Sequence, residues 1–146
     1  MSKTMISLGL ALAAAALLPA QPGAAELRTG DDNGDGKPDR WFVISNGAIV
    51  EYRADSDFDG RVDALVKYAG GDRLEYEEYD YNLDGTMDDF YFYENGLLKR
   101  REVDSDFDGK VDLWVHLTGG RYVERLEKDT NFDGTVDVVR DYRKRR

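Results

Sequence analysis

A nine-residue phrase rich in aspartate occurs five times in this chain and constrains its fold more than any other feature. Each copy has aspartate at its first, fifth and ninth places, aspartate or asparagine at its third place and glycine at its sixth place. The copies, named loops 1 to 5 here, are Asp31–Asp39, Asp55–Asp63, Asp80–Asp88, Asp104–Asp112 and Asp129–Asp137. Their glycines follow one another at an almost constant spacing, at Gly36, Gly60, Gly85, Gly109 and Gly134. Such a fixed period predicts a repeat architecture, in which each unit buries its apolar surface against its neighbours.

The segments between the loops alternate apolar and polar residues and carry a turn signal near their centre. Asn46-Gly47 and Asn95-Gly96 each separate two such runs, and Asn-Gly in that position is the strongest short signal for a β-hairpin. Gly70-Gly71 and Gly119-Gly120 occupy the same place in the other units. Apolar residues rarely recur at helical spacing. The sequence therefore predicts an all-β chain of tandem β-hairpin repeats, with about ten short antiparallel strands, the first near residues 26–28.

The spacing of the glycines alternates in a way that predicts a local irregularity. Each turn glycine follows its loop glycine at the same distance along the chain, whereas the distance from a turn glycine to the next loop glycine is alternately shorter and longer by one. Because side chains alternate faces along a strand, the extra residue must be absorbed by a bulge or a loop. Consecutive hairpins favour an up-and-down order of strands. The pattern leaves open whether the sheet is an open meander, a barrel or a solenoid.

Residues 1–25 are typical of a secretory signal peptide. Lys3 precedes an apolar run from residue 6 to residue 18, and small residues at 23–25 offer a cleavage site before Glu26. The run is too short for a bilayer span, and the alternative is an uncleaved anchor. We therefore expect a secreted or periplasmic protein, with residues 26–146 forming a single repeat domain of five units, the last one incomplete.

Charge and cysteine content narrow the classes of partner. Without residues 1–25 the chain holds 19 Lys+Arg against 30 Asp+Glu, a formal net charge of −11. Such a chain repels nucleic acid and anionic membranes, so we expect no nucleic-acid partner and no membrane insertion after signal cleavage. The chain has no cysteine, which excludes both a lipoprotein anchor and disulfides. Small exported domains commonly need stabilisation beyond a hydrophobic core, either by disulfides or by a bound metal. Because disulfides are excluded here, a bound metal is the remaining candidate.

The loops have the chemistry of calcium sites. Calcium takes six to eight oxygen ligands, and the short carboxylates at alternate places of a tight loop converge on one point. The sixth-place glycine permits the sharp turn, and the seventh residue can offer its backbone carbonyl. Up to five Ca²⁺ ions are expected. The candidate ligands are Asp31, Asn33, Asp35, Lys37 and Asp39 in loop 1; Asp55, Asp57, Asp59, Arg61 and Asp63 in loop 2; Asp80, Asn82, Asp84, Thr86 and Asp88 in loop 3; Asp104, Asp106, Asp108, Lys110 and Asp112 in loop 4; and Asp129, Asn131, Asp133, Thr135 and Asp137 in loop 5.

The phrase resembles the first nine positions of the EF-hand loop, but the resemblance ends there. An EF-hand places a bidentate glutamate at the twelfth position, where this chain has Phe42, Val66, Tyr91, Val115 and Arg140. The loops are more similar to the D-x-D-x-D-G-x-x-D calcium loops of secreted bacterial β-repeat proteins of the FG-GAP/VCBS type. They share their aspartate spacing with thrombospondin type 3 repeats, which normally carry cysteines. The likeness implies calcium binding by loops that lead directly into strands.

The alternative is that the aspartates and glycines merely form polar turns, which both residues favour. Five copies with the same acidic places argue against it, because uncompensated like charges repel one another. Without the glutamate ligand the sites should be weak or moderate, with dissociation constants on the order of 10⁻⁴ to 10⁻³ M. The apolar residues at the fourth and eighth places are expected to face inward and tie each loop to the core. They are Phe58, Leu83, Phe107 and Phe132 at the fourth place, and Val62, Met87, Val111 and Val136 at the eighth.

Enzymatic interpretations have less support. His116 is the only histidine, and no serine or cysteine nucleophile is identifiable beside it, so we expect a non-enzymatic protein. Glu75, Glu77 and Glu78 are interpreted as a solvated strand edge, where charge discourages unwanted pairing. The favoured function is an exported calcium-binding scaffold for interaction or envelope structure. The alternative is a secreted carbohydrate-binding module or hydrolase with purely structural calcium, and a third option is capture of a polypeptide on an edge strand.

Overall fold

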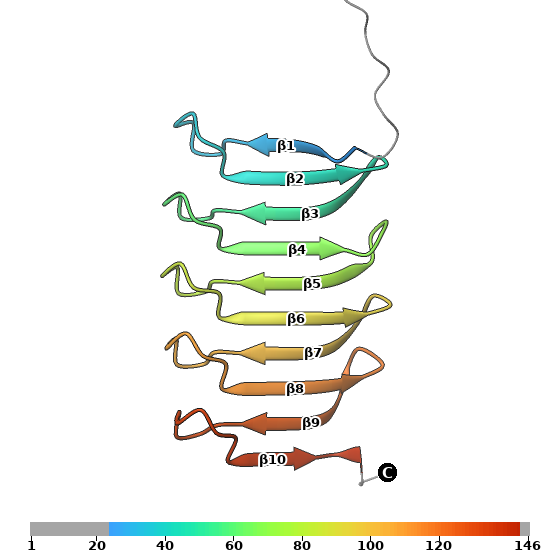
Figure 1. Cartoon of the computed structure of the whole chain (residues 1–146), viewed down its shortest axis with the longest axis vertical. Helices are drawn as coiled ribbons and strands as arrows, with labels where there is room; N and C mark the ends of the chain where they lie inside the picture. The colour runs from blue at the N-terminus through green and yellow to red at the C-terminus, as the bar shows by residue number, and fades with distance from the viewer. Residues whose placement is uncertain (1–23, 144–146) are drawn as a thin grey trace, which may run out of the picture.

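The chain folds into a single open sheet of ten antiparallel strands in sequential order (Figure 1). The computed structural model describes residues 24–143, so the signal-peptide prediction falls almost entirely outside the described residues. The prediction of an all-β chain with about ten antiparallel strands in up-and-down order is thus confirmed, and of the three arrangements left open the sheet is an open meander. The strands are β1 (Glu26–Gly30), β2 (Arg40–Ser45), β3 (Ala48–Ala54), β4 (Ala64–Tyr68), β5 (Leu74–Tyr79), β6 (Asp89–Glu94), β7 (Leu97–Val103), β8 (Leu113–Thr118), β9 (Tyr122–Lys128) and β10 (Val138–Asp141).

The two ends of the strands carry different connections. All five aspartate loops lie at one end of the strands, on the side of the sheet called the loop edge here, and the four hairpin turns lie at the other end of the strands (Figure 1). Asn46 and Gly47 both have positive φ, 51° and 78°, as a two-residue type I′ turn requires. The other two hairpins have longer connections. Residues 119–121 join β8 to β9, and residues 69–73 join β4 to β5, where the N–H of Ala69 donates to the carbonyl of Arg73 around the three residues 70–72. The extra residue of the longer units is therefore absorbed in the hairpin turn, as the spacing required.

Every hairpin also contains a register shift at the same place. The shifts lie at Val43/Ile44, Lys67/Tyr68, Phe92/Tyr93 and His116/Leu117. Bulges of this kind increase the local twist of a strand pair. Because they occur in long and short units alike, they are part of the repeat and do not account for the alternating length.

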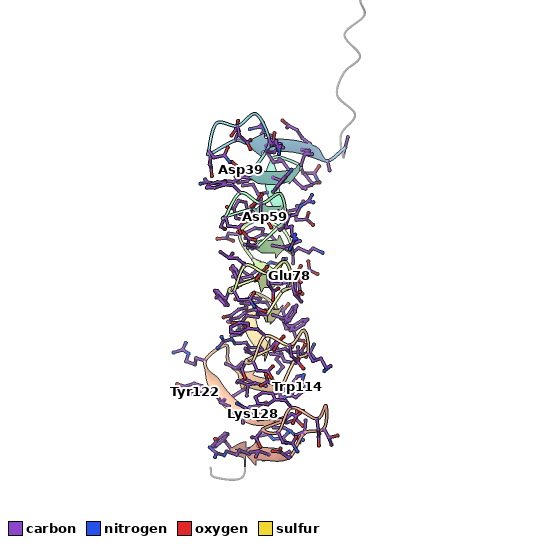
Figure 2. The ribbon with its side chains drawn as sticks, turned by 90° about the vertical axis from the view of Figure 1, so that its left-hand side faces the viewer. Asp39, Asp59, Glu78, Trp114, Tyr122 and Lys128 are labelled. Carbon is purple, nitrogen blue, oxygen red and sulfur yellow. The ribbon has the colours of Figure 1, made fainter. Side chains whose placement is uncertain are left out.

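The sheet is one layer thick, and its two faces differ in composition. Seen from the loop edge it forms a narrow column with side chains on both sides (Figure 2). Directly paired residues share a face, so the registers place 24 side chains of β2–β9 on one face, of which 19 are apolar or aromatic. We call this the apolar face. Its apolar members are Phe42, Ile44, Ile49, Tyr52, Ala54, Ala64, Val66, Tyr68, Leu74, Tyr79, Tyr91, Tyr93, Leu98, Val103, Leu113, Val115, Leu117, Val123 and Leu126.

The opposite face, called the ion-pair face here, mixes aromatic and charged side chains. Arg53 pairs with Glu51 and Arg100 with Glu102 along their own strands, and the Arg100 guanidinium lies 4.2 Å from the centre of the Phe92 ring. Charged stems that lie flat over rings in this way cover apolar surface without a second layer.

Little of the molecule is a conventional core. Among residues 24–143, only Val66 and Leu117 are buried apolar side chains, and both belong to the apolar face. No helix in the same range is long and apolar enough to cross a membrane. The remaining buried side chains are aspartates from the loops and their flanks: Asp39, Asp55, Asp63, Asp80, Asp88, Asp89, Asp104, Asp112 and Asp129. The best-buried groups thus gather along the loop edge.

Candidate metal sites

Backbone hydrogen bonds fix both ends of every loop to the sheet. In loop 2 the N–H of Asp63 donates to the carbonyl of Ala54, just before the loop, over 2.8 Å. The N–H of Asp80, which opens loop 3, donates in turn to the carbonyl of Asp63, also over 2.8 Å. Equivalent bonds recur from loop to loop. The five loops therefore form one connected row, in which the end of each is hydrogen-bonded to the start of the next.

The first-place aspartate organises the loop backbone. In loop 4, Asp104 accepts the N–H of Phe107 on Oδ1 at 2.8 Å and that of Gly109 on Oδ2 at 2.7 Å. Loops 1 to 3 repeat both bonds. In loop 5, Asp129 accepts the N–H of Gly134 on Oδ2, but its Oδ1 is buried without a hydrogen-bond partner. A buried carboxylate oxygen without a donor is costly, and a cation would satisfy it.

The ninth-place aspartate closes the loop from the other side. Asp112 accepts the N–H of Ser105 on Oδ2 at 2.6 Å and the Ser105 hydroxyl on Oδ1 at 2.8 Å. Its counterpart in each of the other loops also accepts the second-place N–H. The ninth-place aspartate is buried in loops 1 to 4, and only Asp137 is exposed. These aspartates hold loop shape as well as offering oxygen ligands.

Third-place aspartates bring additional negative charge into loops 2 and 4, called the Asp-type loops here. Oxygens of Asp55, Asp57 and Asp63 all lie within 4.8 Å of one another, as do those of Asp104, Asp106 and Asp108. Loss of some hydration within the loop, followed by the charge of Asp108, raises the pKa of Asp106 although its side chain is exposed. The pKa of Asp57 is also raised: the N–H of Asp59 favours its charged form, but lost hydration and the neighbouring carboxylates outweigh that bond. Both groups have the crowded oxygen geometry that a divalent cation relieves.

Loops 1, 3 and 5, called the Asn-type loops here, have asparagine at the third place. The amide Nδ2 of Asn82 donates to Asp84 Oδ2 at 2.9 Å, and that of Asn131 donates to Asp133 Oδ2 at 3.1 Å. The hydrogen bond from Asn82, followed by that from the N–H of Thr86, lowers the pKa of Asp84. Among residues 24–143, carboxylate groups of three that lie this close occur in the Asp-type loops alone.

The seventh-place side chain takes part in the loops, in addition to the backbone carbonyl, which was the only group predicted to act there. Lys110 Nζ lies 2.9 Å from Asp108 Oδ2, and this bond is the main reason that the pKa of Asp108 is lowered. Arg61 reaches into the next loop, where its Nη1 donates to the carbonyl oxygen of Asp84 at 2.7 Å. The sequence contains a pattern that indicates this role. Each loop with four acidic residues also has a lysine or arginine at the seventh place, so every loop has a formal charge of −3.

The expected inward orientation of the fourth-place side chains is wrong. Phe58, Leu83, Phe107 and Phe132 are between 42% and 47% exposed. All four adopt positive φ, between 58° and 68°, a conformation that is unusual for bulky residues. The tight path between the first and sixth places requires that conformation, and it directs the side chain away from the core. At the eighth place, three residues are half-buried and Val136 is 37% exposed.

His116 belongs to the ion-pair face. Its Nε2 lies 3.0 Å from Glu127 Oε2, and the other oxygen of Glu127 accepts from Arg125 at 2.6 Å. The bond from Arg125, followed by that from His116, lowers the pKa of Glu127. The histidine thus sits in a cross-strand charge cluster.

The interpretation of Glu75, Glu77 and Glu78 as a strand edge is wrong, because β5 is an interior strand of the sheet. Glu75 is exposed, as expected, whereas Glu77 and Glu78 are half-buried and accept hydrogen bonds from the hydroxyls of Tyr93 and Tyr76, respectively.

Comparisons with known proteins add little to this geometry. No family model matches the chain, and no curated protein matches it. The chain is similar in structure to part of a chain in the crystal structure of accessory secretory protein 1, 2 and 3 in Streptococcus pneumoniae, with 14% identity and a TM-score of 0.47. That match covers 72% of this chain and 19% of the other.

Proposed function

We propose that this chain is an exported calcium-binding β-repeat protein. In this proposal the aspartate loops hold up to five Ca²⁺ ions and thereby stabilise a sheet that serves as a scaffold for interaction or envelope structure. The observation that carries the proposal is the convergence of carboxylate oxygens in the Asp-type loops, within 4.8 Å of one another in each. The donor set contains only oxygen, which suits a hard cation and excludes a zinc site of the cysteine and histidine type.

The loop backbone supports the proposal because it is ordered around converging negative charge. The first and ninth aspartates shape the loop through backbone N–H groups, and the third and fifth places contribute exposed oxygens. The unpartnered Oδ1 of Asp129 fits a cation in loop 5. Bound calcium would supply two positive charges per loop, against a formal loop charge of −3.

A thin sheet has a specific need for such stabilisation. Only two apolar side chains are buried among residues 24–143, so hydrophobic burial contributes less than in a two-layer domain. An ion that binds the folded state alone stabilises it by mass action. At a calcium concentration 100 times the dissociation constant, each site contributes about 2.7 kcal/mol. Because the loops are hydrogen-bonded in a row, ordering one loop supports its neighbours.

Isothermal titration calorimetry with CaCl₂, paired with thermal melting in calcium and in EDTA, tests the proposal. We expect saturable binding of more than one ion per chain at submillimolar to millimolar calcium, and a melting temperature that falls when the ion is removed. Magnesium is the matched control, since its demand for octahedral geometry makes it a poor substitute. The absence of binding heat together with identical melting curves contradicts the proposal.

A further inference from the structure

The apolar face of the sheet is broad, continuous and without a second layer. Nineteen of its 24 positions in β2–β9 are apolar or aromatic, whereas charged residues are common on the ion-pair face. Residues 24–143 form these ten strands and no helix or second sheet. Most of these side chains are half-buried within the single layer, and Ile49 and Val123 are each 41% exposed. A broad apolar surface that is only partly covered is typical of an interaction surface.

The two charges at the centre of this face, those of Glu77 and Arg101, have partners within the chain itself. Arg101 Nη2 lies 2.5 Å from Asp89 Oδ2, and Glu77 accepts the hydroxyl of Tyr93 at 2.7 Å. The other two charged positions lie at strand ends beside the loop edge, where Arg40 pairs with Asp32 and Lys128 ends β9. Two such faces can therefore approach each other at their centres without burying a charge that lacks a partner.

The dimensions of the face match a stable protein interface. The eight strands β2–β9, about 4.8 Å apart, span about 38 Å, and three side-chain rows along each strand span about 17 Å. The product is about 650 Å², within the range of about 600 to 1,000 Å² per partner that standard interfaces bury. A single helix, about 10 Å across, would leave much of this width uncovered.

We propose that a second copy of this chain covers the apolar face, so that the protein is a face-to-face dimer with the architecture of a β-sandwich. Two sheets pack well when their twists agree, at about −30° and about 10 Å apart. A second copy has the same twist, length and row spacing by construction. This inference stands independently of calcium binding, because it uses only the sheet.

Sedimentation velocity of the purified protein, with its N-terminus defined by mass spectrometry, tests the inference. We expect a dimer in the micromolar range. The matched variants are Val115→Glu and Trp114→Glu, since these neighbours on β8 are both half-buried and lie on opposite faces. Val115→Glu should shift the protein to monomer, and Trp114→Glu should leave it dimeric. A monomeric wild type, or equal dissociation by both variants, overturns the inference.

A pair of less disruptive variants tests for the face-to-face dimer if a buried glutamate prevents folding. The chain has no cysteine, so single thiols can be placed on each face of β3. Ala54 lies on the apolar face and Ala48 on the ion-pair face, and both are half-buried in the single chain. In a face-to-face dimer, Ala54→Cys should react with a maleimide several-fold more slowly than Ala48→Cys. Equal reaction rates of the two variants overturn the inference. Slow reaction of Ala54→Cys in a protein that is monomeric and retains residues 1–23 also overturns it, because the face would then be covered without a second copy.

Discussion

Loops 3 and 4 share one backbone path but balance their charge in different ways. In loop 4 the third place is Asp106, and Lys110 compensates the fourth acid by pairing with Asp108. In loop 3 the third place is Asn82, whose amide binds Asp84 directly, and the seventh place is a neutral threonine. Both loops reach a formal charge of −3. The comparison teaches that the same backbone path can carry two kinds of third-place residue. An asparagine amide donates a hydrogen bond to the fifth-place carboxylate, whereas an aspartate brings another carboxylate close to it, which a cation could bind.

The largest expected effect comes from removing the aspartate that shapes the loop. Asp104→Ala deprives the N–H groups of Phe107 and Gly109 of their acceptor, and in metal-free buffer this should cost about 3 kcal/mol of unfolding free energy. Asp129→Ala removes an acceptor from Gly134 alone and should cost about half as much. Urea unfolding of both variants gives the two values. Equal losses would show that the two kinds of loop depend on this residue alike.

An exchange of the third-place residues should exchange the behaviour of the loops. We expect Asp57→Asn with Asp106→Asn to weaken calcium binding at two sites by about tenfold, because each loses one charged ligand. The reverse double variant, Asn82→Asp with Asn131→Asp, should strengthen binding at two sites. Calorimetric titration of both against the wild type measures the change. A titration curve unaffected by either exchange would mean that the third place is not a ligand.

Much of the fold could be read from the sequence, because the repeat is explicit. Glycine spacing and the Asn-Gly pairs predicted the ten strands and their order, and the alternating spacing required an extra residue that the structure places in the hairpin connections. Whether the sheet closes was beyond the sequence, because closure depends on accumulated twist and register over many strands.

The candidate sites were less fully predictable than the fold. The aspartate positions followed from the phrase, but the orientation of Phe58 and Phe107 did not. An apolar side chain normally suggests burial, and the left-handed backbone at the fourth place overrides that preference. Nor could the sequence show that Arg61 contacts the next loop, since the contact depends on how successive loops lie side by side along the edge. The amide bond of Asn82 to Asp84 likewise became visible only with the backbone path in place.

Because of their pKa shifts, the Asp-type and Asn-type loops should contribute differently to the pH dependence of stability in metal-free buffer. The pKa values of Asp57 and Asp106 are raised in the folded protein, so these groups favour folding when protonated and oppose it when charged. Their Asn double variant should therefore be more stable than the wild type at pH 7, and the difference should vanish as the pH falls to about 4. The pKa of Asp84 is lowered, so its contribution runs the other way and is lost on acidification. Thermal melting at both pH values checks this, and a pH-independent difference between the two proteins contradicts it.

The smallest expected effect concerns the link between an Asp-type and an Asn-type loop. Arg61 of loop 2 donates to the carbonyl of Asp84 and packs against Gly85, so Arg61→Thr should loosen loop 3 although the substitution lies in loop 2. A hydrogen bond from an exposed side chain contributes about 0.5 kcal/mol, which corresponds to a fall of about 2 °C in melting temperature. Lys110→Thr is the matched control, because Lys110 pairs within its own loop. Residue-resolved hydrogen exchange should show faster exchange of the Gly85 N–H in Arg61→Thr and no change at Gly134 in Lys110→Thr. If both substitutions act only within their own loops, the row of loops is joined by the backbone alone.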